Sequence, residues 1–320
     1  MATIGTDIDQ AARILRNGDL VGIPTETVYG LAGNALNSDA ILKIFEVKKR
    51  PSFDPLIVHI DSVESLHEYV LDIPVKADKL AKVFWPGPLT LIFPKNAVIP
   101  DVVTSGLSTV AIRIPSHPLT LLLLKSLDFP LAAPSANPFG YVSPTTASHV
   151  DDQLGYKLSY ILDGGICDIG IESTIIGFEQ ETPVIQRLGG KTVEEIEDIV
   201  GRVHVERYST SQPIAPGMLQ SHYAPGKKKV FLGQWSDYQT MLEKEKTALI
   251  RFQHPDTNFP SNRQAILSEQ GDLKEAAKNL FTTLRKFDTS EIDYIVAELV
   301  PETGFGRAIN DRLRRAAAIG

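Results

Sequence analysis

The chain has 320 residues, enough for two domains that each bury a core of their own. Apolar residues make up 43% of it and charged residues 22%, close to ordinary globular usage, which excludes disordered and fibrous architectures. The net charge of -7 disfavours a surface built mainly to grip a nucleic-acid backbone.

The composition of the N-terminus and the cysteine content favour a cytoplasmic location. Residues Met1 to Gly18 mix charged and apolar side chains and lack the long apolar core of a signal peptide. The most apolar stretch, Leu119 to Leu124, is far shorter than the roughly 20 residues that span a bilayer, so we expect no membrane segment. The single cysteine, Cys167, excludes an internal disulfide and a multi-cysteine zinc site and fits a reducing compartment.

Between Ile8 and Gly201, short β-branched runs alternate with helical patterns, which predicts an α/β fold with helices packed on a twisted mixed sheet. The expected helices cover Ile8 to Arg16, Ser38 to Lys48, Val63 to Val70, Ala77 to Phe84 and Leu119 to Leu127. The expected strands cover Leu20 to Ile23, Leu56 to Ile60, Leu89 to Phe93, Val110 to Ile114, Leu131 to Ala133, Ser159 to Leu162, Thr174 to Phe178 and Val184 to Arg187. Ser38 is expected to cap the second helix.

A segment rich in proline and glycine, Tyr208 to Gly226, predicts a linker because these residues disfavour continuous helix and sheet. Beyond it, a new alternation predicts a smaller α/β domain of about 90 residues. Its expected strands cover Lys229 to Leu232, Ala248 to Phe252 and Tyr294 to Glu298, and its expected helices cover Ser236 to Glu245, Asp272 to Phe287 and Phe305 to Ala317. The predicted organisation is a first domain at 1–205, a linker at 206–227 and a second domain at 228–320.

Polar residues gather in the loops of the first domain. The segment from Pro24 to Gly30 brings hydroxyls and a carboxylate to the end of a strand, although a turn with capping hydroxyls is the simpler explanation in isolation. Lys48 and Arg50 lie at the end of a helix that Pro51 terminates, which leaves both side chains able to point toward an anion such as a phosphate chain. Stabilisation of the helix dipole is the structural alternative for these cations.

Further candidates are uncharged loop residues and one cation within a strand. Ser135, Asn137 and Ser143 offer hydrogen bonds without charge, although ordinary loop positions explain them equally well. Arg113 stands in the apolar run Val110 to Pro115, where a cation is costly unless it is paired. We therefore expect it to meet a carboxylate from the protein or from a substrate. The set is completed by Glu172, Ser173, Thr174 and Arg187, for which solvated strand ends are the alternative.

Several common mechanisms are disfavoured. The run Gly190-Lys191-Thr192 is similar to the end of a phosphate-binding P-loop, but the first glycine of that motif would fall at Ile185. The histidines lack the i, i+4 pairing of a helical zinc site, and no Gly-x-Ser-x-Gly elbow is present. Metal-dependent hydrolysis and Ser-His-Asp chemistry are therefore not expected.

Separated motifs occur in a family-specific order at Pro24 to Gly30, Lys48-x-Arg50, Trp85 to Thr90, Ser135-x-Asn137, Ala215 to Met218, His222 to Pro225 and Gly304 to Arg312. Together they resemble the YrdC family, specifically the longer, two-domain type of threonylcarbamoyl-AMP synthase, over nearly the whole chain. The resemblance implies a concave, mostly positive cleft over a twisted α/β sheet, followed by a smaller Rossmann-like domain.

The same resemblance implies two sets of ligand contacts. Threonine would be contacted by Thr27, His59, Arg113, the Ala133 backbone and Ser173. ATP would be contacted by Arg50, Asp54, Thr109, Ser135, Asn137, Ser143, Arg187 and Tyr223, with Lys48 completing the signature. Magnesium would be held chiefly by the phosphates of ATP.

The implied reaction joins the threonine amine to bicarbonate or carbon dioxide, and the resulting N-carboxylate attacks the α-phosphorus of ATP and expels pyrophosphate. Lys48 and Arg50 would be the catalytic residues that stabilise phosphate charge, and Arg113 would hold the threonine carboxylate. The product would serve modification of tRNA position 37 through a downstream threonylcarbamoyl-transfer complex. Residues Ala215 to Pro225 would fold over the cleft as a lid that excludes water.

Two other functions stay open at this stage. An RNA-binding module would show salt-dependent binding without threonine-dependent ATP consumption, but the acidic net charge allows only weak RNA binding. A carbamoyl-transfer enzyme of metalloenzyme maturation would share the fold. Such chains usually carry acylphosphatase-like and zinc-finger-like segments, and a single cysteine excludes the latter.

Overall fold

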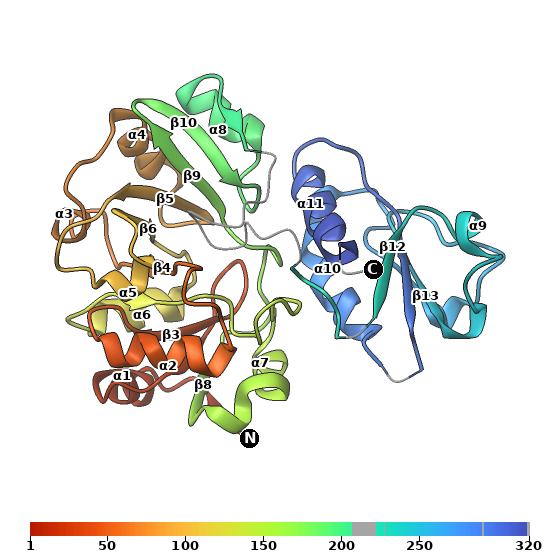
Figure 1. Cartoon of the computed structure of the whole chain (residues 1–320), viewed down its shortest axis with the longest axis horizontal. Helices are drawn as coiled ribbons and strands as arrows, with labels where there is room; N and C mark the ends of the chain where they lie inside the picture. The colour runs from red at the N-terminus through yellow and green to blue at the C-terminus, as the bar shows by residue number, and fades with distance from the viewer. Residues whose placement is uncertain (207–221, 227, 290, 319–320) are drawn as a thin grey trace. The chain divides into compact units, whose positions relative to one another are not determined.

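The computed structural model describes residues 1–206, 222–226, 228–289 and 291–318 (Figure 1). The linker and lid predicted for 206–227 lie outside the described residues, except for 206 and 222–226. The described chain forms two compact units. The first unit holds residues 1–139, 144–168 and 172–206, and the second holds 140–143, 169–171 and the described residues from 222 onward.

Within its described residues, the first unit contains an 11-stranded mixed sheet with the strand order β1-β8-β2-β3-β7-β4-β6-β5-β9-β10-β11. Its strands are β1 (Thr3–Gly5), β2 (Val21–Ile23), β3 (Gly30–Asn34), β4 (Ile57–His59), β5 (Leu89–Pro94), β6 (Thr109–Arg113), β7 (Leu131–Ala132), β8 (Tyr160–Leu162), β9 (Thr174–Glu179), β10 (Thr182–Arg187) and β11 (His204–Val205). Strand β4 runs parallel to β6, whereas β5 runs antiparallel to β6. The twist of this sheet is visible in the red to green part of Figure 1.

Helices pack against this sheet in separate apolar clusters. They are α1 (Ile8–Arg16), α2 (Ser38–Lys48), α3 (Leu66–Tyr69), α4 (Val75–Phe84), α5 (Asp101–Thr104), α6 (Pro118–Ser126), α7 (Ala147–Leu154) and α8 (Val193–Val200), with a 3-10 turn at Gly155–Lys157. Helices α1 and α6 bury Leu15 and Leu123 in one cluster, whereas α2 and α4 bury Ile41 and Leu80 in the main core. Each helix thus presents one apolar stripe to the sheet.

Strand β6 positions the predicted site because its side chains alternate between the two faces of the sheet. Ile112 enters the main core, whereas Ala111 belongs to a separate small cluster that includes Ile57. The parallel register places Ile57 beside Ala111 and His59 beside Arg113. On the face opposite the main core, the apolar pair of Ile57 and Ala111 is therefore followed by the polar pair of His59 and Arg113.

The second unit contains, within its described residues, a four-stranded parallel sheet in the order β12-β15-β13-β14. Its strands are β12 (Lys229–Leu232), β13 (Thr247–Arg251), β14 (Gln264–Ile266) and β15 (Tyr294–Ala297), and its helices are α9 (Trp235–Tyr238), α10 (Leu273–Lys286) and α11 (Gly306–Ala317), with 3-10 turns at Lys244–Lys246 and Ser261–Arg263. Parallel strands with intervening helices confirm the predicted Rossmann-like α/β arrangement.

Several short elements escaped the sequence pattern, namely β1, β3, β11, β14, α5, α7 and α8. In β3 the glycines Gly30 and Gly33 interrupt the apolar pattern, so local propensity does not predict a strand there. The strand forms because it pairs with β2 and β7. The helix expected at Val63 to Val70 is confined to α3. There the Ser65 side chain bonds to Asp61 and to the Ser62 carbonyl, which competes with helical hydrogen bonding.

Two further expectations about helices were wrong. The helix predicted at Ser236 to Glu245 is confined to α9 and the 3-10 turn at Lys244–Lys246. The cap of α2 is Asn37, not Ser38, because Asn37 Oδ1 accepts the Asp39 and Ala40 amides at 2.9 and 3.3 Å. Asn37 has the extended backbone that an N-cap requires, whereas Ser38 is already helical.

Candidate active site

Arg113 is the centre of a buried polar cluster. Its Nη2 donates to Glu26 Oε1 at 2.6 Å, its Nη1 to Thr27 Oγ1 at 3.0 Å and its Nε to the Gly87 carbonyl at 3.2 Å. The second oxygen of Glu26 accepts the Ser116 amide at 3.1 Å. Arg113 is 4% exposed and Glu26 is 6% exposed. The expected carboxylate partner of Arg113 is therefore confirmed, and within this chain it is Glu26.

His59 lies beside Arg113 on the neighbouring strand and is neutral. It is buried, and burial together with the Arg113 charge lowers its pKa to about 3. Its Nδ1 is buried and has no hydrogen-bond partner among the residues that the structure describes. A neutral ring nitrogen in this position can bond to a hydroxyl or amine of a ligand.

Ser173 connects the ends of β5 and β10. Its Oγ lies 2.7 Å from Thr90 Oγ1. Arg187 donates to the Ser173 carbonyl from Nε at 3.1 Å and from Nη2 at 3.0 Å, and to Ser173 Oγ from Nη2 at 3.1 Å. A Cβ on Gly189 would lie only 2.3 Å from the Glu172 carbonyl oxygen, so glycine is required for this close backbone approach. The Ser173 hydroxyl is thus held firmly beside two strands of the site face.

Lys48 joins the two signature segments through backbone carbonyls. Its Nζ donates to the Ser135 carbonyl at 2.5 Å and to the Asn137 carbonyl at 2.6 Å, and the side chain is buried. Burial lowers the pKa of the Lys48 ammonium well below its ordinary value, Arg50 lowers it further, and Asp54 partly offsets both effects. A buried ammonium needs acceptors, and the two carbonyls provide them, whereas the contact of Lys48 with a phosphate stays a prediction.

Arg50 turns back onto its own loop. Its Nε donates to the Asp54 carbonyl at 3.0 Å and its Nη2 to the Pro55 carbonyl at 2.8 Å. Nη2 also forms an ion pair with Asp54 Oδ2 at 2.9 Å, although neither buried Asp54 carboxylate oxygen accepts an aligned hydrogen bond from the described residues. Burial raises the pKa of Asp54, whereas Arg50, Lys48 and Arg187 lower it. Arg50, like Lys48, therefore bonds to groups of the protein, and its contact with a phosphate stays a prediction.

The remaining predicted residues of the first unit lie close by. Ala133 follows β7, and its amide donates to the Ile57 carbonyl at 3.1 Å. Thr109 begins β6 and is half-buried, two residues before Ala111 on the same face. The predicted residues of this unit thus form one neighbourhood that extends from Arg113 and His59, through Ser173 and Arg187, to Asp54 and Lys48.

Ser143 and Tyr223 belong to the second unit. The Ser143 carbonyl accepts Arg285 Nε at 3.3 Å. The Tyr223 ring is buried, stacks on Phe281 with 5.4 Å between ring centroids and lies 5.3 Å from the Arg312 guanidinium. The Tyr223 ring is therefore a core element of its unit, and its proposed contact with ATP stays a prediction.

Two members of the cluster were not among the predicted ligand contacts. Glu26 lies within the Pro24 to Gly30 motif, but its pairing with Arg113, 87 positions away, depends on the fold. Thr90 ends the Trp85 to Thr90 motif and bonds to Ser173, 83 positions away. For both residues the sequence contains one indication of a role in the site, namely a polar side chain within a motif that adjoins an apolar strand.

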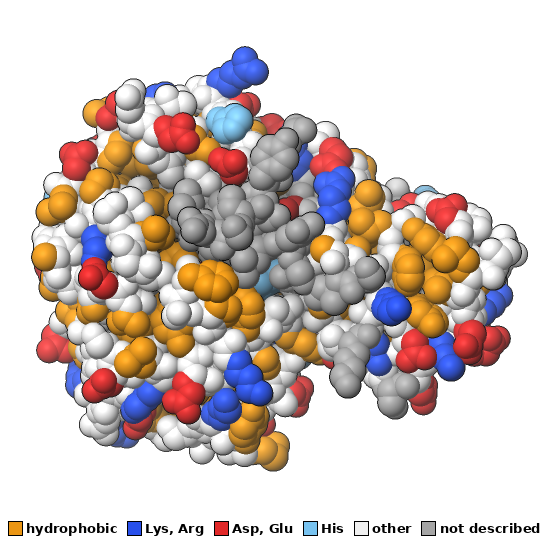
Figure 2. Space-filling view, in the orientation of Figure 1, with side chains coloured by type: hydrophobic (Ala, Val, Ile, Leu, Met, Phe, Trp, Pro, Cys, Tyr) orange, Lys and Arg blue, Asp and Glu red, His pale blue; other side chains and the backbone are white. Residues whose placement is uncertain are grey.

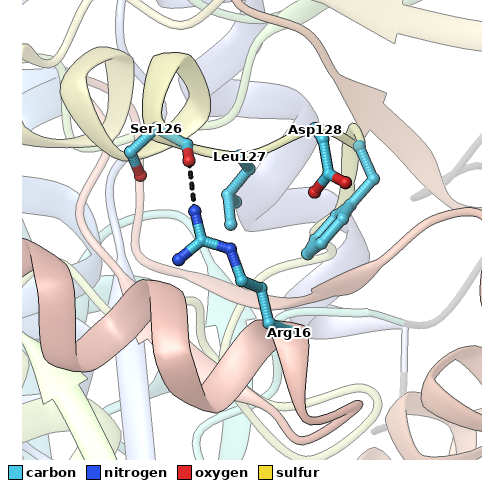
Figure 3. Close-up of a pocket in the computed structure, with 5 residues that line it drawn as sticks. Arg16, Ser126, Leu127 and Asp128 are labelled. Atoms are coloured by element: carbon cyan, nitrogen blue, oxygen red, sulfur yellow. Dashed lines mark hydrogen bonds between the residues drawn. The ribbon is translucent and has the colours of Figure 1, made fainter.

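Surface hollows occur on another part of the first unit. Figure 3 shows one that is lined by Arg16, Ser126, Leu127, Asp128 and Phe129, where Arg16 donates to the Ser126 carbonyl. A neighbouring hollow shares Leu127, Asp128 and Phe129. Neither hollow contains a member of the Arg113 cluster, so both are separate from the candidate site.

The described surface and side chains also bear on other classes of site. In the face shown in Figure 2, acidic and basic side chains of the described residues are interspersed and not gathered by sign. Among the described residues, no group of three or more His, Cys, Asp or Glu is arranged to hold a metal ion. In the same part of the chain, no helix combines the length and the apolar character needed to cross a membrane.

Comparison with known proteins covers both units. Residues 13–189 match the Sua5, YciO and YrdC family, which is described as telomere recombination. Residues 191–318 match the C-terminal domain of threonylcarbamoyl-AMP synthase. A threonylcarbamoyl-AMP synthase of Bacillus subtilis is 41% identical over 99% of this chain and 94% of that protein. One from Pyrococcus abyssi is 43% identical over 96% of this chain and 93% of that protein.

A solved structure gives the same result. The crystal structure of P. abyssi Sua5 complexed with L-threonine matches with a TM-score of 0.90 at 39% identity, and the match covers 99% of this chain and 97% of that one. The fold, both family matches and the full-length relatives therefore agree with the motif pattern in the sequence. The chain belongs to the Sua5/YrdC family of threonylcarbamoyl-AMP synthases, in its two-domain form.

Proposed function

We propose that the chain is a nucleotidyltransferase that forms threonylcarbamoyl-AMP and pyrophosphate from L-threonine, bicarbonate and ATP. The observation that carries this proposal is the buried guanidinium of Arg113, held by Glu26 and Thr27, in a chain whose full length matches proteins named for this activity. An arginine fixed in this way suits the α-carboxylate of an amino acid. The P. abyssi relative is solved in complex with L-threonine.

Threonine would bind at the Arg113 end of the site. The described contacts of Arg113 use one N–H each of Nε, Nη1 and Nη2, and a guanidinium carries five. Two N–H groups therefore remain to hold a carboxylate. His59 Nδ1, Thr27 Oγ1 and Ser173 Oγ would bond to the threonine hydroxyl and amine, and the Ala133 backbone would complete the contacts.

The triphosphate would lie near Lys48, Arg50 and Arg187. A bound polyanion favours the charged form of a nearby amine, so ATP would raise the pKa of the Lys48 ammonium. Lys48 would then act through its charge and by holding the carbonyls of Ser135 and Asn137 in place. The other proposed contacts with ATP are Asp54, Thr109, Ser135, Asn137, Ser143 and Tyr223.

In the proposed reaction, bicarbonate loses water as its carbon joins the threonine amine, and an oxygen of the N-carboxylate then attacks the α-phosphorus of ATP. The bond from the α-phosphorus to the bridging oxygen breaks, and pyrophosphate leaves with the electron pair. This route needs no protein nucleophile. The protein contributes alignment and positive charge beside the phosphate oxygens, where loss of one preorganised group typically costs on the order of 100-fold in rate.

Magnesium would enter with ATP and be held by phosphate oxygens and water. Mg2+ commonly keeps several waters and binds through substrate phosphates together with one or two carboxylates. Asp54, the carboxylate among the phosphate-binding cations, is already ion-paired with Arg50. Magnesium would therefore neutralise phosphate charge and orient the leaving group.

The product contains a mixed anhydride that water attacks readily, so we propose direct transfer to a downstream complex that modifies tRNA. The enzyme itself would bind RNA weakly at most, because its net charge of -7 opposes contact with phosphate backbones. A cytoplasmic location would bring it together with ATP, threonine and tRNA.

The test is a reconstitution with the purified full-length chain. Incubation with ATP, magnesium, bicarbonate and threonine should give threonylcarbamoyl-AMP by mass spectrometry and an equal amount of pyrophosphate. Omission of any one substrate should abolish the product. Pyrophosphate release that is independent of threonine, or no adenylate at all, would refute the proposal.

A further inference from the structure

Thr25 and Thr27 stand on either side of Glu26 and form a buried pair of hydroxyls. Thr25 is 3% exposed and Thr27 is 0% exposed. Their Oγ1 atoms lie 2.8 Å apart, so a hydrogen bond joins them, and the other contacts of each hydroxyl decide its direction. A hydroxyl has one proton to donate and two lone pairs that accept. Counting these groups fixes the position of both protons.

The proton of Thr25 goes to the Val28 carbonyl. The two oxygens lie 2.6 Å apart, and a carbonyl has no proton, so Thr25 is the donor. The amides of Thr27 and Val28, each at 3.2 Å, donate to Thr25 Oγ1. Because Thr25 has no second proton, Thr27 donates the bond between the two hydroxyls. The proton of Thr27 is therefore used inside the protein.

Thr27 Oγ1 consequently faces the Arg113 cluster as an acceptor only. One of its lone pairs accepts Arg113 Nη1 at 3.0 Å, and the other has no donor among the described residues. A carboxylate oxygen cannot bond to it, since both atoms would be acceptors. The α-amine of an amino acid is attached to the carbon next to the carboxylate, so it is the donor closest to a carboxylate held by Arg113. The open lone pair of Thr27 thus suits an N–H of that amine.

A second hydroxyl pair of the cluster has the opposite property. The Oγ atoms of Thr90 and Ser173 lie 2.7 Å apart, and Arg187 Nη2 donates to Ser173 at 3.1 Å. This pair uses one of its two protons between its own oxygens, and the other proton has no acceptor among the residues that the structure describes. The pair therefore offers a donor, which suits an oxygen atom of a ligand. Thr27 has no such spare proton, because the proton of Thr25 is already committed to a carbonyl.

We propose that Thr25 is a positioning residue that keeps the Thr27 proton away from the substrate amine, so that the lone pair of the amine nitrogen stays free to attack bicarbonate. This inference rests on the proposed function. One N–H of the amine bonds to Thr27, and the nitrogen uses its lone pair to form the bond to carbon. A bond from that carbon to oxygen breaks, and the departing hydroxide takes the other N–H proton and leaves as water. A Thr27 hydroxyl that could turn would donate to the nitrogen lone pair and block the attack.

The experiment compares Thr25→Val with wild type in the full-length chain. Calorimetric titration gives the Kd for threonine and the fraction of competent sites. Pyrophosphate release at saturating threonine and ATP, with bicarbonate varied, gives kcat/KM for bicarbonate per competent site. We expect this kcat/KM to fall roughly 2- to 12-fold, the factor for one hydrogen bond that must break before the attack. The Kd for threonine should not rise, because the released proton of Thr27 forms a new bond to the amine.

Three further variants separate this role from simple support of the loop. Thr25→Ser keeps the hydroxyl and should keep the wild-type kcat/KM for bicarbonate. Thr104→Val is the matched control, because Thr104 is a buried threonine outside the Arg113 cluster that donates to the Leu107 carbonyl at 3.0 Å. It should leave kcat/KM unchanged. Thr25→Cys, whose sulfur is a weak acceptor, should change as Thr25→Val does and is measured if the valine variant does not fold.

The outcomes separate this inference from the proposed function. A higher Kd for threonine with an unchanged kcat/KM for bicarbonate, or equal effects of Thr25→Val and Thr104→Val, would overturn the role of Thr25. A loss in Thr25→Ser as large as that in Thr25→Val would also overturn it. All three results leave the proposed function standing, whereas a wild-type chain that releases no pyrophosphate with threonine and bicarbonate would refute that function itself.

Discussion

Glu26 and Arg113 show how much of this site depends on single pairs of side chains. The Glu26 carboxylate accepts from the Arg113 guanidinium with one oxygen and from the Ser116 amide with the other. Both partners are buried, so neither contact can be replaced by water. Breaking such a pair leaves an uncompensated charge, which is far more unfavourable than the loss of an exposed ion pair.

We expect Glu26→Gln to raise the KM for threonine roughly tenfold or more, in the range typical of a broken buried charge pair, with a smaller effect on the KM for ATP. An amide has one acceptor and one donor, so one of the two Glu26 contacts is lost whichever way the amide faces. Initial rates of pyrophosphate release at varied threonine measure the effect. Glu46→Gln, on the exposed side of α2, is the control. An unchanged KM for threonine would remove Glu26 from the positioning of Arg113.

His59 makes the stability of the fold depend on pH. Its folded pKa of about 3 lies below the ordinary value of 6.5, so the unfolded chain binds a proton that the folded chain does not. The contribution of His59 to the free energy of unfolding is therefore fully present above pH 6.5. It is lost as the pH falls toward 3, by up to about 1.4 kcal/mol per pH unit. Urea unfolding at pH 7 and pH 5 should show a smaller loss for His59→Gln than for wild type. His67→Gln, at an exposed position, should behave like wild type, and equal losses in all three proteins would contradict the prediction.

At the scale of elements, helix α2 carries Lys48 at its last residue, so the cap at its start helps to fix one end of the site. The Asn37 side chain caps two amides of the first turn, whereas Ser38 is the first helical residue and is not the cap. We expect Asn37→Ala to lower the free energy of unfolding by about 1 kcal/mol and Ser38→Ala to change it by a few tenths at most. Chemical denaturation of the two variants measures the difference, and the reverse ranking would show that the cap is assigned wrongly.

At the scale of the whole molecule, neither compact unit is a single continuous stretch of the chain. Residues 140–143 stand within the first half of the sequence but belong to the second unit, where Arg285 donates to the carbonyls of Val142 and Ser143. Tyr141 also bonds to Asp288 there. This segment is therefore held by residues more than 140 positions away.

We expect Arg285→Met to speed hydrogen exchange of the amides at 140–143, because two carbonyls of this segment lose their donor. Lys286→Met, at the next position, is the matched control because the Lys286 ammonium lies over the Phe287 ring and not at this segment. Exchange followed by mass spectrometry of peptides from this region measures the effect. Identical protection in the two variants would show that Arg285 does not hold the segment.

The α/β class, most longer helices and strands, and the motifs that identify the family could be predicted from the order of residues alone. These features follow from local periodicity and from residue types at fixed spacing, which are properties of short stretches of chain. Helices α1 and α2 were predicted to the residue for this reason. The pairing of Arg113 with a carboxylate was also predictable, since a cation in an apolar strand needs one.

Which polar groups meet in the site depends on the three-dimensional fold. It chose Glu26 as the partner of Arg113, turned Lys48 onto the carbonyls of Ser135 and Asn137, and formed β3 around two glycines. Burial and hydrogen bonding depend on neighbours that are distant in the chain, so no local pattern of residues contains this information.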